Sequence, residues 1–208
     1  MFCCHGDASH MGSEEVNILG ALDLSRIQCY NELVAGSGKS VFKSECSKVD
    51  KTRFVDSAGD DPELLLSIPF KSTMRIRGLC LSLGGEYGTC PARVRIYANM
   101  EGLDFSGLES FEPVQELVIR GPDVQAQEWY PLKVVKLGNV SHLYLHFSGR
   151  WSVPEHEQGE GSVRVYYVGL RAEVIAPRVG VVHAMYESRA QASDHKMELG
   201  GGTLTKKV

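Results

Sequence analysis

From residue 64 onward, short runs of alternating apolar and polar residues are separated by turn residues, a pattern typical of antiparallel strands. We interpret as strands residues 64–70, 74–83, 93–100, 114–119, 132–137, 141–148 and 162–175. No convincing helix interrupts this series. The sequence therefore predicts an all-β fold, an antiparallel β-sandwich or jelly roll.

The alternation is irregular at two positions inside these strands. The run 74–83 changes phase at Gly78, which predicts a β-bulge there. The run 64–70 contains Pro69, and a proline suits an edge strand or a strand end.

A short N-terminal helix is expected before the strands begin. In residues 22–34, LDLSRIQCYNELV, Asp23 can cap the helix, and Leu24, Ile27 and Cys29 fall roughly on one side.

The segments around this helix are predicted to be irregular. Residues 35–63 are rich in Gly, Ser, Lys and Asp, so we expect a long loop, pinned to the core by Phe42 and residues 54–55. Residues 1–16 lack periodicity and residues 198–208 are glycine-rich. We expect a disordered arm and a disordered tail at these ends, flanking one domain at residues 17–197.

Residues 35–40, AGSGKS, resemble the second half of a phosphate-binding loop. The complete motif requires a glycine at position 33, where this chain has Leu33. Such a loop also connects a buried parallel strand to a helix whose N-terminus faces the phosphates. Here the preceding residues have a helical pattern, and the following ones lack an apolar helical face. We therefore interpret the segment as a glycine-serine turn without nucleotide-binding activity.

The composition restricts the classes of partner. The chain has 208 residues, 43% of them hydrophobic, and a formal net charge of −4 with both signs interspersed. This balance argues against nucleic acid as a partner. No apolar run approaches the roughly 18 residues that cross a bilayer, and the first residues do not resemble a secretory signal. We therefore expect no membrane partner.

Six scattered cysteines have no disulfide-framework spacing, which favours free thiols in a reducing compartment. We therefore expect a cytoplasmic protein, with an additional nuclear location left open. The N-terminal group Cys3, Cys4, His5 and His10 matches no structural zinc motif. We predict neither a metal site nor a cofactor.

Two histidines, His142 and His146, are four residues apart. The glutamate of a zinc-protease helix is absent between them. On a strand, residues four apart are separated by about 13 Å, so the two rings cannot share one ion. Together with Tyr144 they face away from the core. We interpret the three as an exposed or edge-lined stripe, for which a partner-binding surface is the functional alternative.

One polar loop contains Trp151 beside Arg150, residue types that dominate many protein interfaces. We consider both a role in protein binding and a tryptophan folded back onto the end of the sandwich. A second loop carries Asp104, Glu109 and Glu112, which a jelly roll could use to bind calcium or a sugar.

Several segments in the same order together resemble the PITH domain, and particularly the stand-alone PITH domain-containing proteins. The resemblance extends from about residue 18 to 197. No single motif is specific, and the match depends on their number and order. The segments are residues 28–32 (QCYNE), 36–38, 41–42, 54–57, 63–65, 68–70, 94–99, 104–105, 112–115, 131–132, 139–143, 167–171, 186–190 and 192–196.

The resemblance implies a jelly-roll sandwich like that of galactose-binding domains, and a function without catalysis. In thioredoxin-like relatives this domain docks on the proteasome, whereas the present chain has no thioredoxin domain. The resemblance supplies no docking residues. We therefore expect a monomeric, non-enzymatic adaptor that docks on the proteasome regulatory particle. The alternative is a carbohydrate- or calcium-binding jelly roll.

Overall fold

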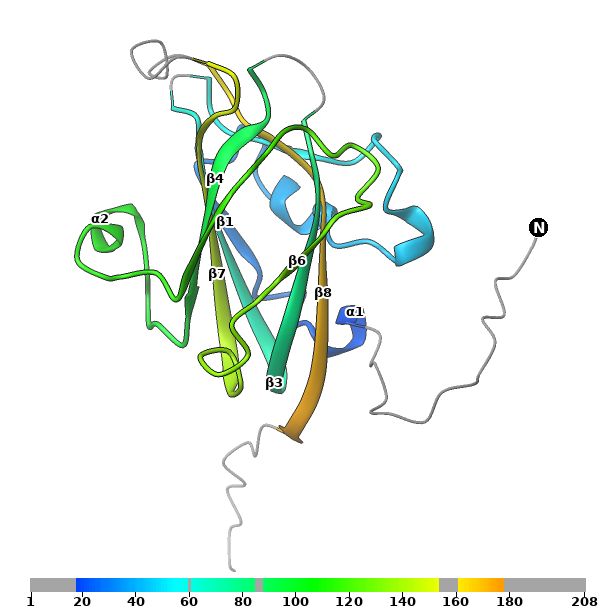
Figure 1. Cartoon of the computed structure of the whole chain (residues 1–208), viewed down its shortest axis with the longest axis vertical. Helices are drawn as coiled ribbons and strands as arrows, with labels where there is room; N and C mark the ends of the chain where they lie inside the picture. The colour runs from blue at the N-terminus through cyan, green and yellow to red at the C-terminus, as the bar shows by residue number, and fades with distance from the viewer. Residues whose placement is uncertain (1–17, 60, 85–87, 154–160, 178–208) are drawn as a thin grey trace, which may run out of the picture. The chain divides into compact units, whose positions relative to one another are not determined.

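Antiparallel strands make up nearly all of the regular structure in the computed structural model, which describes residues 18–59, 61–84, 88–153 and 161–177 (Figure 1). Its helical segments are short: α1 (Ile18–Ala21), α2 (Phe105–Leu108) and the 3-10 helices η1 (Ser37–Val41) and η2 (Glu45–Ser47). The strands are β1 (Gln28–Tyr30), β2 (Val55–Asp56), β3 (Glu63–Leu83), β4 (Pro91–Ala98), β5 (Gln115–Val118), β6 (Trp129–Pro131), β7 (Val140–Arg150) and β8 (Arg164–Pro177).

The long strand β3 connects the two layers of the sandwich. Its first half pairs with β1 and β7, and its second half pairs with β8 and β6. The strand order is β2-β8-β3-β7-β4-β5, with β1 and β6 attached to β3. In Figure 1, β4 and β7 accordingly lie on one side and β3, β6 and β8 on the other. The predicted antiparallel jelly-roll β-sandwich is confirmed.

Runs 64–70 and 74–83, predicted as two strands, form this single strand. Its pairing with β7 is irregular between Pro69 and Met74, where the proline cannot donate a ladder hydrogen bond. Its pairing with β8 shifts between Ile76 and Gly78, which confirms the predicted bulge. A Cβ atom at position 78 would lie 3.4 Å from the Trp129 ring, which is an ordinary van der Waals contact with β6.

The main core lies between the two layers. Leu143, Leu145 and Phe147 point inward from β7 as the alternation predicts, and Val94 and Ile96 do so from β4. Fully burying side chains of this size stabilises the fold by about 1.5–3 kcal/mol each.

A second cluster lies on the opposite face of the β3-β7-β4 layer. It consists of Leu65, Tyr97, Leu103 and Tyr144. Partly buried hydrophobic residues pack against it from β1 and from the loop that carries α2, namely Tyr30, Met100, Phe105 and Leu108. The layer is therefore covered on both faces where α2 packs.

Two predicted elements are wrong. Residues 22–34 are not a helix, because residues 28–30 pair with β3 as strand β1. The Asp23 carboxylate accepts a hydrogen bond from Ser25 at 2.6 Å and caps no helix there. The short N-terminal helix of the structure is α1, at residues 18–21.

Residues 132–137 are not a strand. They form a turn in which Leu132 and Leu137 are buried while Val135 is fully exposed. The backbone N–H groups of residues 136 and 137 both donate to the carbonyl of Lys133. Two residues that reach the core, Leu132 and Leu137, make this run look apolar in the sequence, although it is not a strand.

Residues 35–63 follow the expected loop, interrupted by η1, η2 and β2. Phe42 and Val55 are buried, as predicted. The predicted arm at 1–16 and tail at 198–208, including Cys3, Cys4, His5 and His10, lie outside the described residues. Within the described part of the chain, no helix has the length and apolar character needed to cross a membrane.

Candidate functional site

The predicted stripe on β7 is largely covered. His142, Tyr144 and His146 do share the face opposite the main core, but Tyr144 and His146 are each only 2% exposed. The α2 loop packs over Tyr144 in the second cluster, and its Phe105 packs against His146, so the prediction of an exposed stripe is wrong for these two residues. Their proposed role in protein binding stays a prediction.

Each histidine has its own partner on β3. His142 Nε2 lies 2.7 Å from the Ser67 hydroxyl, and its ring stacks on Tyr144 at 4.4 Å. His146 Nε2 lies 3.2 Å from a carboxylate oxygen of Glu63. Ser67 is buried at 3% exposure, whereas His142 is partly exposed.

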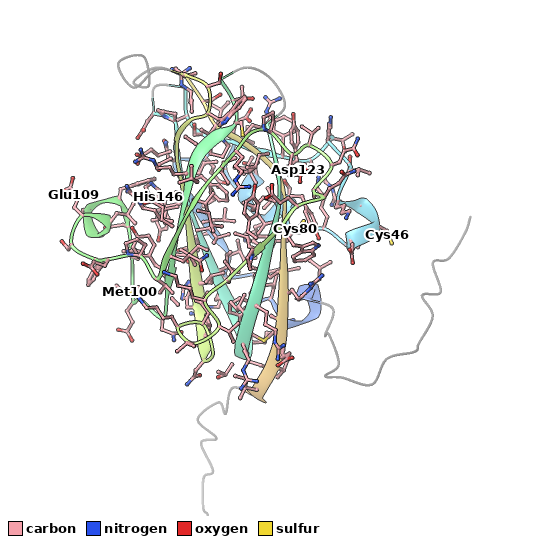
Figure 2. The ribbon with its side chains drawn as sticks, viewed as in Figure 1. Cys46, Cys80, Met100, Glu109, Asp123 and His146 are labelled. Atoms are coloured by element: carbon pink, nitrogen blue, oxygen red, sulfur yellow. The ribbon has the colours of Figure 1, made fainter. Side chains whose placement is uncertain are left out.

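Figure 2 shows His146 beside the strands, with Glu109 farther out next to α2. The edge of the Phe105 ring packs against the His146 ring, with centroids 6.0 Å apart. The hydrogen bond from His146 is the main reason why the pKa of Glu63 is lowered. Burial raises the pKa of nearby Asp61 instead. These features describe a packed structural cluster.

The loop pair Arg150 and Trp151 also has structural contacts. Trp151 is half-buried against the main core, and its ring lies close to Gly121. Arg150 lies close to Gly88 and Gly161 at the same end of the sandwich. This is the folded-back arrangement considered above. Whether either residue binds a protein stays a prediction.

The acidic loop does not assemble a binding site with Trp151. Asp104 caps α2, because its carboxylate accepts hydrogen bonds from the Ser106 hydroxyl at 2.6 Å and the Gly107 backbone at 2.9 Å. It follows the end of β4, whereas Arg150 pairs with the start of that strand. The loop of Asp104 covers the second cluster, whereas Trp151 packs against the main core on the other face of the layer. Among the described residues, no three His, Cys, Asp or Glu side chains are placed to hold a metal ion.

The glycine turn, residues 35–40, does form an anion site, and the anion is part of the chain. The Glu32 carboxylate accepts hydrogen bonds from the backbone N–H groups of Gly36 and Gly38, the latter at 2.7 Å. The Ser37 hydroxyl donates to it at 3.3 Å. Successive N–H groups of this kind form a nest that suits an oxyanion. Glu32 supplies, from within the chain, the oxyanion that such a nest binds.

Close packing against Cys29 also fixes the glycine turn. A Cβ atom at position 38 would overlap the side chain of Cys29, and Gly36 has a left-handed φ of 81°. Burial raises the pKa of the Cys29 thiol, and the charge of Glu32 adds to this. Cys29 therefore remains protonated and serves as a packing residue.

Two hollows flank the glycine turn. The smaller, of about 340 Å³, is lined by Ile27, Gln28, Cys29, Tyr30, Glu32, Gly36 and Lys39. The larger, of about 440 Å³, is mostly apolar, and we name it the apolar groove. Its lining residues are Leu33, Val34, Ser37, Ser40, Thr52, Arg53, Phe54 and Asp56.

The wall of the apolar groove formed by Leu33 and Val34 is unusual in its exposure. These side chains are 60% and 64% exposed, although backbone hydrogen bonds hold the main chain of both residues in place. The Leu33 N–H donates to the carbonyl of Asp56 at 2.9 Å, and the Val34 carbonyl accepts from Ser37 at 3.0 Å. Two adjacent apolar side chains are thus held in water on a fixed turn.

The opposite wall is equally well anchored. The Phe54 ring lies 4.3 Å from the Arg164 guanidinium and packs edge-on against Tyr166 at 5.9 Å. Arg164 forms two hydrogen bonds, of 2.6 and 2.7 Å, to the Asp56 carboxylate, which raise the pKa of the arginine. Paired forks of this kind are geometrically specific.

A buried lysine organises the loop that carries the groove's rim. Lys43 is 3% exposed, and its ammonium donates to the backbone carbonyls of Asp50 and Arg53. Burial lowers the pKa of Lys43. The Asp50 carboxylate in turn accepts from the Thr52 backbone at 2.9 Å. The arrangement presents Thr52 and Arg53 at the edge of the groove.

The sequence pattern did not identify this groove. Leu33 and Val34 were interpreted as the end of a helix, and Phe54 only as an anchor. A signal was present, however: a glutamate followed by glycines four and six positions later, with two large apolar residues directly after the glutamate. Such spacing allows the carboxylate to fold back onto the turn and leaves the two apolar side chains outside.

Comparison with known proteins identifies relatives over most of the chain. The family model of the PITH domain matches residues 8–190. PITH domain-containing protein 1 of Xenopus laevis is 35% identical over 184 residues, which cover 88% of this chain and 83% of the relative. Its namesake in Dictyostelium discoideum is 32% identical over 181 residues, covering 87% and 85%.

Solved structures give a more distant likeness. CBM32-3 from a family 31 glycoside hydrolase of Clostridium perfringens has a TM-score of 0.49 and 9% identity, covering 76% of this chain and 97% of that one. An F5/8 type C domain from Bacteroides fragilis has a TM-score of 0.43 and 12% identity, covering 74% and 95%.

Proposed function

Because the chain belongs to the PITH domain family, we propose that it is a non-catalytic docking domain that binds the proteasome regulatory particle through the apolar groove. The family resemblance supplies the candidate partner, and the groove supplies the candidate contact. The four described cysteines Cys29, Cys46, Cys80 and Cys90 are free, so nothing in this part of the chain pairs them for dithiol chemistry.

One observation carries the proposal. Leu33 and Val34 are exposed on a backbone fixed by the Glu32 carboxylate, next to a mostly apolar groove. Exposed apolar patches bordered by polar residues mark interaction sites. A fixed turn also loses little conformational freedom on binding, which improves affinity. No comparable support exists for carbohydrate or calcium binding, since Asp104 is engaged as a helix cap.

The experiment is affinity purification from cytosol at modest salt, followed by quantitative mass spectrometry. The bait is the full chain, compared with Leu33→Glu and with Val118→Glu as a matched control. Val118 is 67% exposed on β5 and is not among the residues that line the groove. Circular dichroism and thermal melting establish that all three baits are folded.

We expect regulatory-particle subunits with the wild type and with Val118→Glu, and at least tenfold less with Leu33→Glu, because the variant places a charge at the contact. Failure of the folded wild type to recover these subunits would refute proteasome docking. Equal recovery by all three baits would place docking on another surface.

A further inference from the structure

The charges around the apolar groove restrict the chemical class of ligand that it can bind. Two carboxylates near the groove already have partners within the chain, one a guanidinium and the other uncharged N–H and hydroxyl groups. Asp56 is paired with Arg164, and Glu32 is held by the N–H groups of the glycine turn. The Arg164 guanidinium offsets the charge of Asp56, whereas the N–H groups stabilise the negative charge of Glu32 without removing it.

The loop that leads to the groove's rim contains more basic than acidic residues. Residues 48–53, KVDKTR, contain three basic residues and one acidic residue. Arg53 lines the groove and is about half exposed, and its contact with Asp50 is long, at 3.5 Å. An exposed pair of this length contributes little, so the guanidinium can exchange it for a better carboxylate.

The chain's own acidic loop lies elsewhere. In Figure 2, Cys46 on η2 and Glu109 beside α2 lie on opposite sides of the strands. The carboxylate paired with Arg53 is that of Asp50, which follows η2 in the same loop. The exposed acidic residues Asp104, Glu109 and Glu112 are thus not the counter-charges of Arg53. The rim therefore carries one half-exposed cation, Arg53, at the edge of an apolar surface.

From these features we infer that the apolar groove binds a short extended segment of a partner protein, with one or two large apolar side chains directly next to Asp or Glu. This inference rests on the proposed docking function and specifies its ligand. The apolar side chains would pack between Leu33, Val34 and Phe54. A neighbouring carboxylate would pair with Arg53 in the two-pronged geometry that guanidinium groups favour.

Two segments of this chain outside the described residues are competing occupants. Residues 178–208 contain five basic and three acidic residues, so their charge opposes binding beside the Arg53 guanidinium. Residues 1–17 contain three acidic and no basic residues, together with Phe2, and match the inferred chemistry better. Both are therefore included in the test as synthetic peptides.

The test selects phage-displayed random dodecapeptides on the immobilised full chain and removes those that also bind Leu33→Glu. Enriched peptides are then synthesised and titrated by fluorescence anisotropy against the wild type, Leu33→Glu, Arg53→Glu and Val118→Glu. We expect enriched peptides to combine Leu, Ile, Phe or Trp with adjacent Asp or Glu. Circular dichroism establishes the folding of each variant.

The variants should differ in a defined order. Leu33→Glu should weaken binding at least about tenfold, and Arg53→Glu about three- to tenfold at 0.1 M salt. Val118→Glu should stay within about twofold, as expected for a surface change outside the contact. The effect of Arg53→Glu should shrink at 1 M salt, where the screening length is about 3 Å.

Several results would overturn the inference: no enrichment over Leu33→Glu, enriched peptides without acidic residues, or unchanged binding by Arg53→Glu. Binding of the synthetic 1–17 or 178–208 peptide with the same sensitivity to Leu33→Glu would assign the groove to the chain itself. Acidic apolar peptides found without recovery of proteasome subunits would uphold the ligand class and refute only the proteasome as partner.

Discussion

The two faces of this domain that carry distinctive residues, the second cluster and the apolar groove, differ in what surrounds them. On β7, histidines and a tyrosine form a pattern that suggests chemistry, yet the α2 loop covers Tyr144 and His146. At the glycine turn the apolar residues Leu33 and Val34 attract less notice in the sequence, yet they are exposed. Accessibility, more than residue type, separates a structural cluster from a candidate site.

The glycine turn also shows why a partial motif can mislead. Its N–H groups are arranged for an oxyanion, as the likeness to a phosphate-binding loop suggests. Because the Glu32 carboxylate is that oxyanion, the N–H groups of the turn are already occupied and do not require a nucleotide phosphate. Its function in the structure is to hold Leu33 and Val34 in place.

The largest expected effect is a difference in the free energy of unfolding lost when one residue from each region is replaced. Tyr144→Ala should lower the free energy of unfolding by about 3–4 kcal/mol, since it removes a buried ring and leaves a cavity. Leu33→Ala should change it by less than about 0.5 kcal/mol, because the side chain is exposed. Urea unfolding followed by tryptophan fluorescence measures both. Similar losses for the two variants would contradict the contrast between the regions.

The second prediction concerns the packing beneath the glycine turn. Gly38→Ala should lower the free energy of unfolding by about 2–3 kcal/mol, because its Cβ would overlap Cys29. Gly20→Ala in α1 is the matched control, since no atom lies within 4 Å of the Cβ position there. We expect the control to be neutral or slightly stabilising. Equal stability of the two variants in urea would show that the turn can relax.

The third prediction tests the internal anion. Glu32→Gln should cost about 1–2 kcal/mol, because an amide replaces a carboxylate that accepts from two N–H groups and a hydroxyl. Glu116→Gln, which removes only an exposed pair with Arg95, should cost about 0.5 kcal/mol or less. Thermal melts under identical conditions compare the two. A larger loss for Glu116→Gln would refute the role of Glu32.

The smallest expected effect is a pH dependence within the second cluster. The pKa of Glu63 is lowered below its ordinary 4.5 by its hydrogen bond to His146. Its stabilising contribution is therefore complete above the unfolded pKa and is lost as the pH falls through the lower, folded value. Glu63→Gln should accordingly lose less stability than the wild type between about pH 5 and pH 3.

Asp61 gives the control of opposite sign. Burial raises its pKa in the folded state, so its ionised carboxylate destabilises the fold near neutral pH. Asp61→Asn should therefore raise the melting temperature at pH 7, and this gain should disappear as the pH is lowered. If the melting temperatures of both variants depended on pH as that of the wild type does, neither carboxylate would contribute to the pH dependence of stability.

The strands of the fold were largely predictable because alternation is a local signal. Residues 93–100, 141–148 and 162–175 agree with β4, β7 and β8 within a few residues. The failures at 22–34 and 132–137 have a long-range cause. Residues 28–30 become a strand because β3 offers an edge, and residues 132 and 137 are apolar because both reach the core.

The candidate site was less predictable for the same reason. The alternation placed His142, Tyr144 and His146 on the correct face but contains no information on what covers that face. The covering residues, among them Leu103 and Phe105, come from a loop some forty positions earlier in the chain. The groove joins residues 33–40 with residues 52–56, and no local pattern indicates that pairing.

The most direct test of the central claim is hydrogen–deuterium exchange of the full chain with and without purified proteasome regulatory particle. The account predicts slower exchange on binding in residues 31–40 and 48–56, and no change in residues 99–111. Protection confined to residues 99–111 and β7, with residues 31–40 unaffected, would contradict this account. It would place the docking surface at the second cluster.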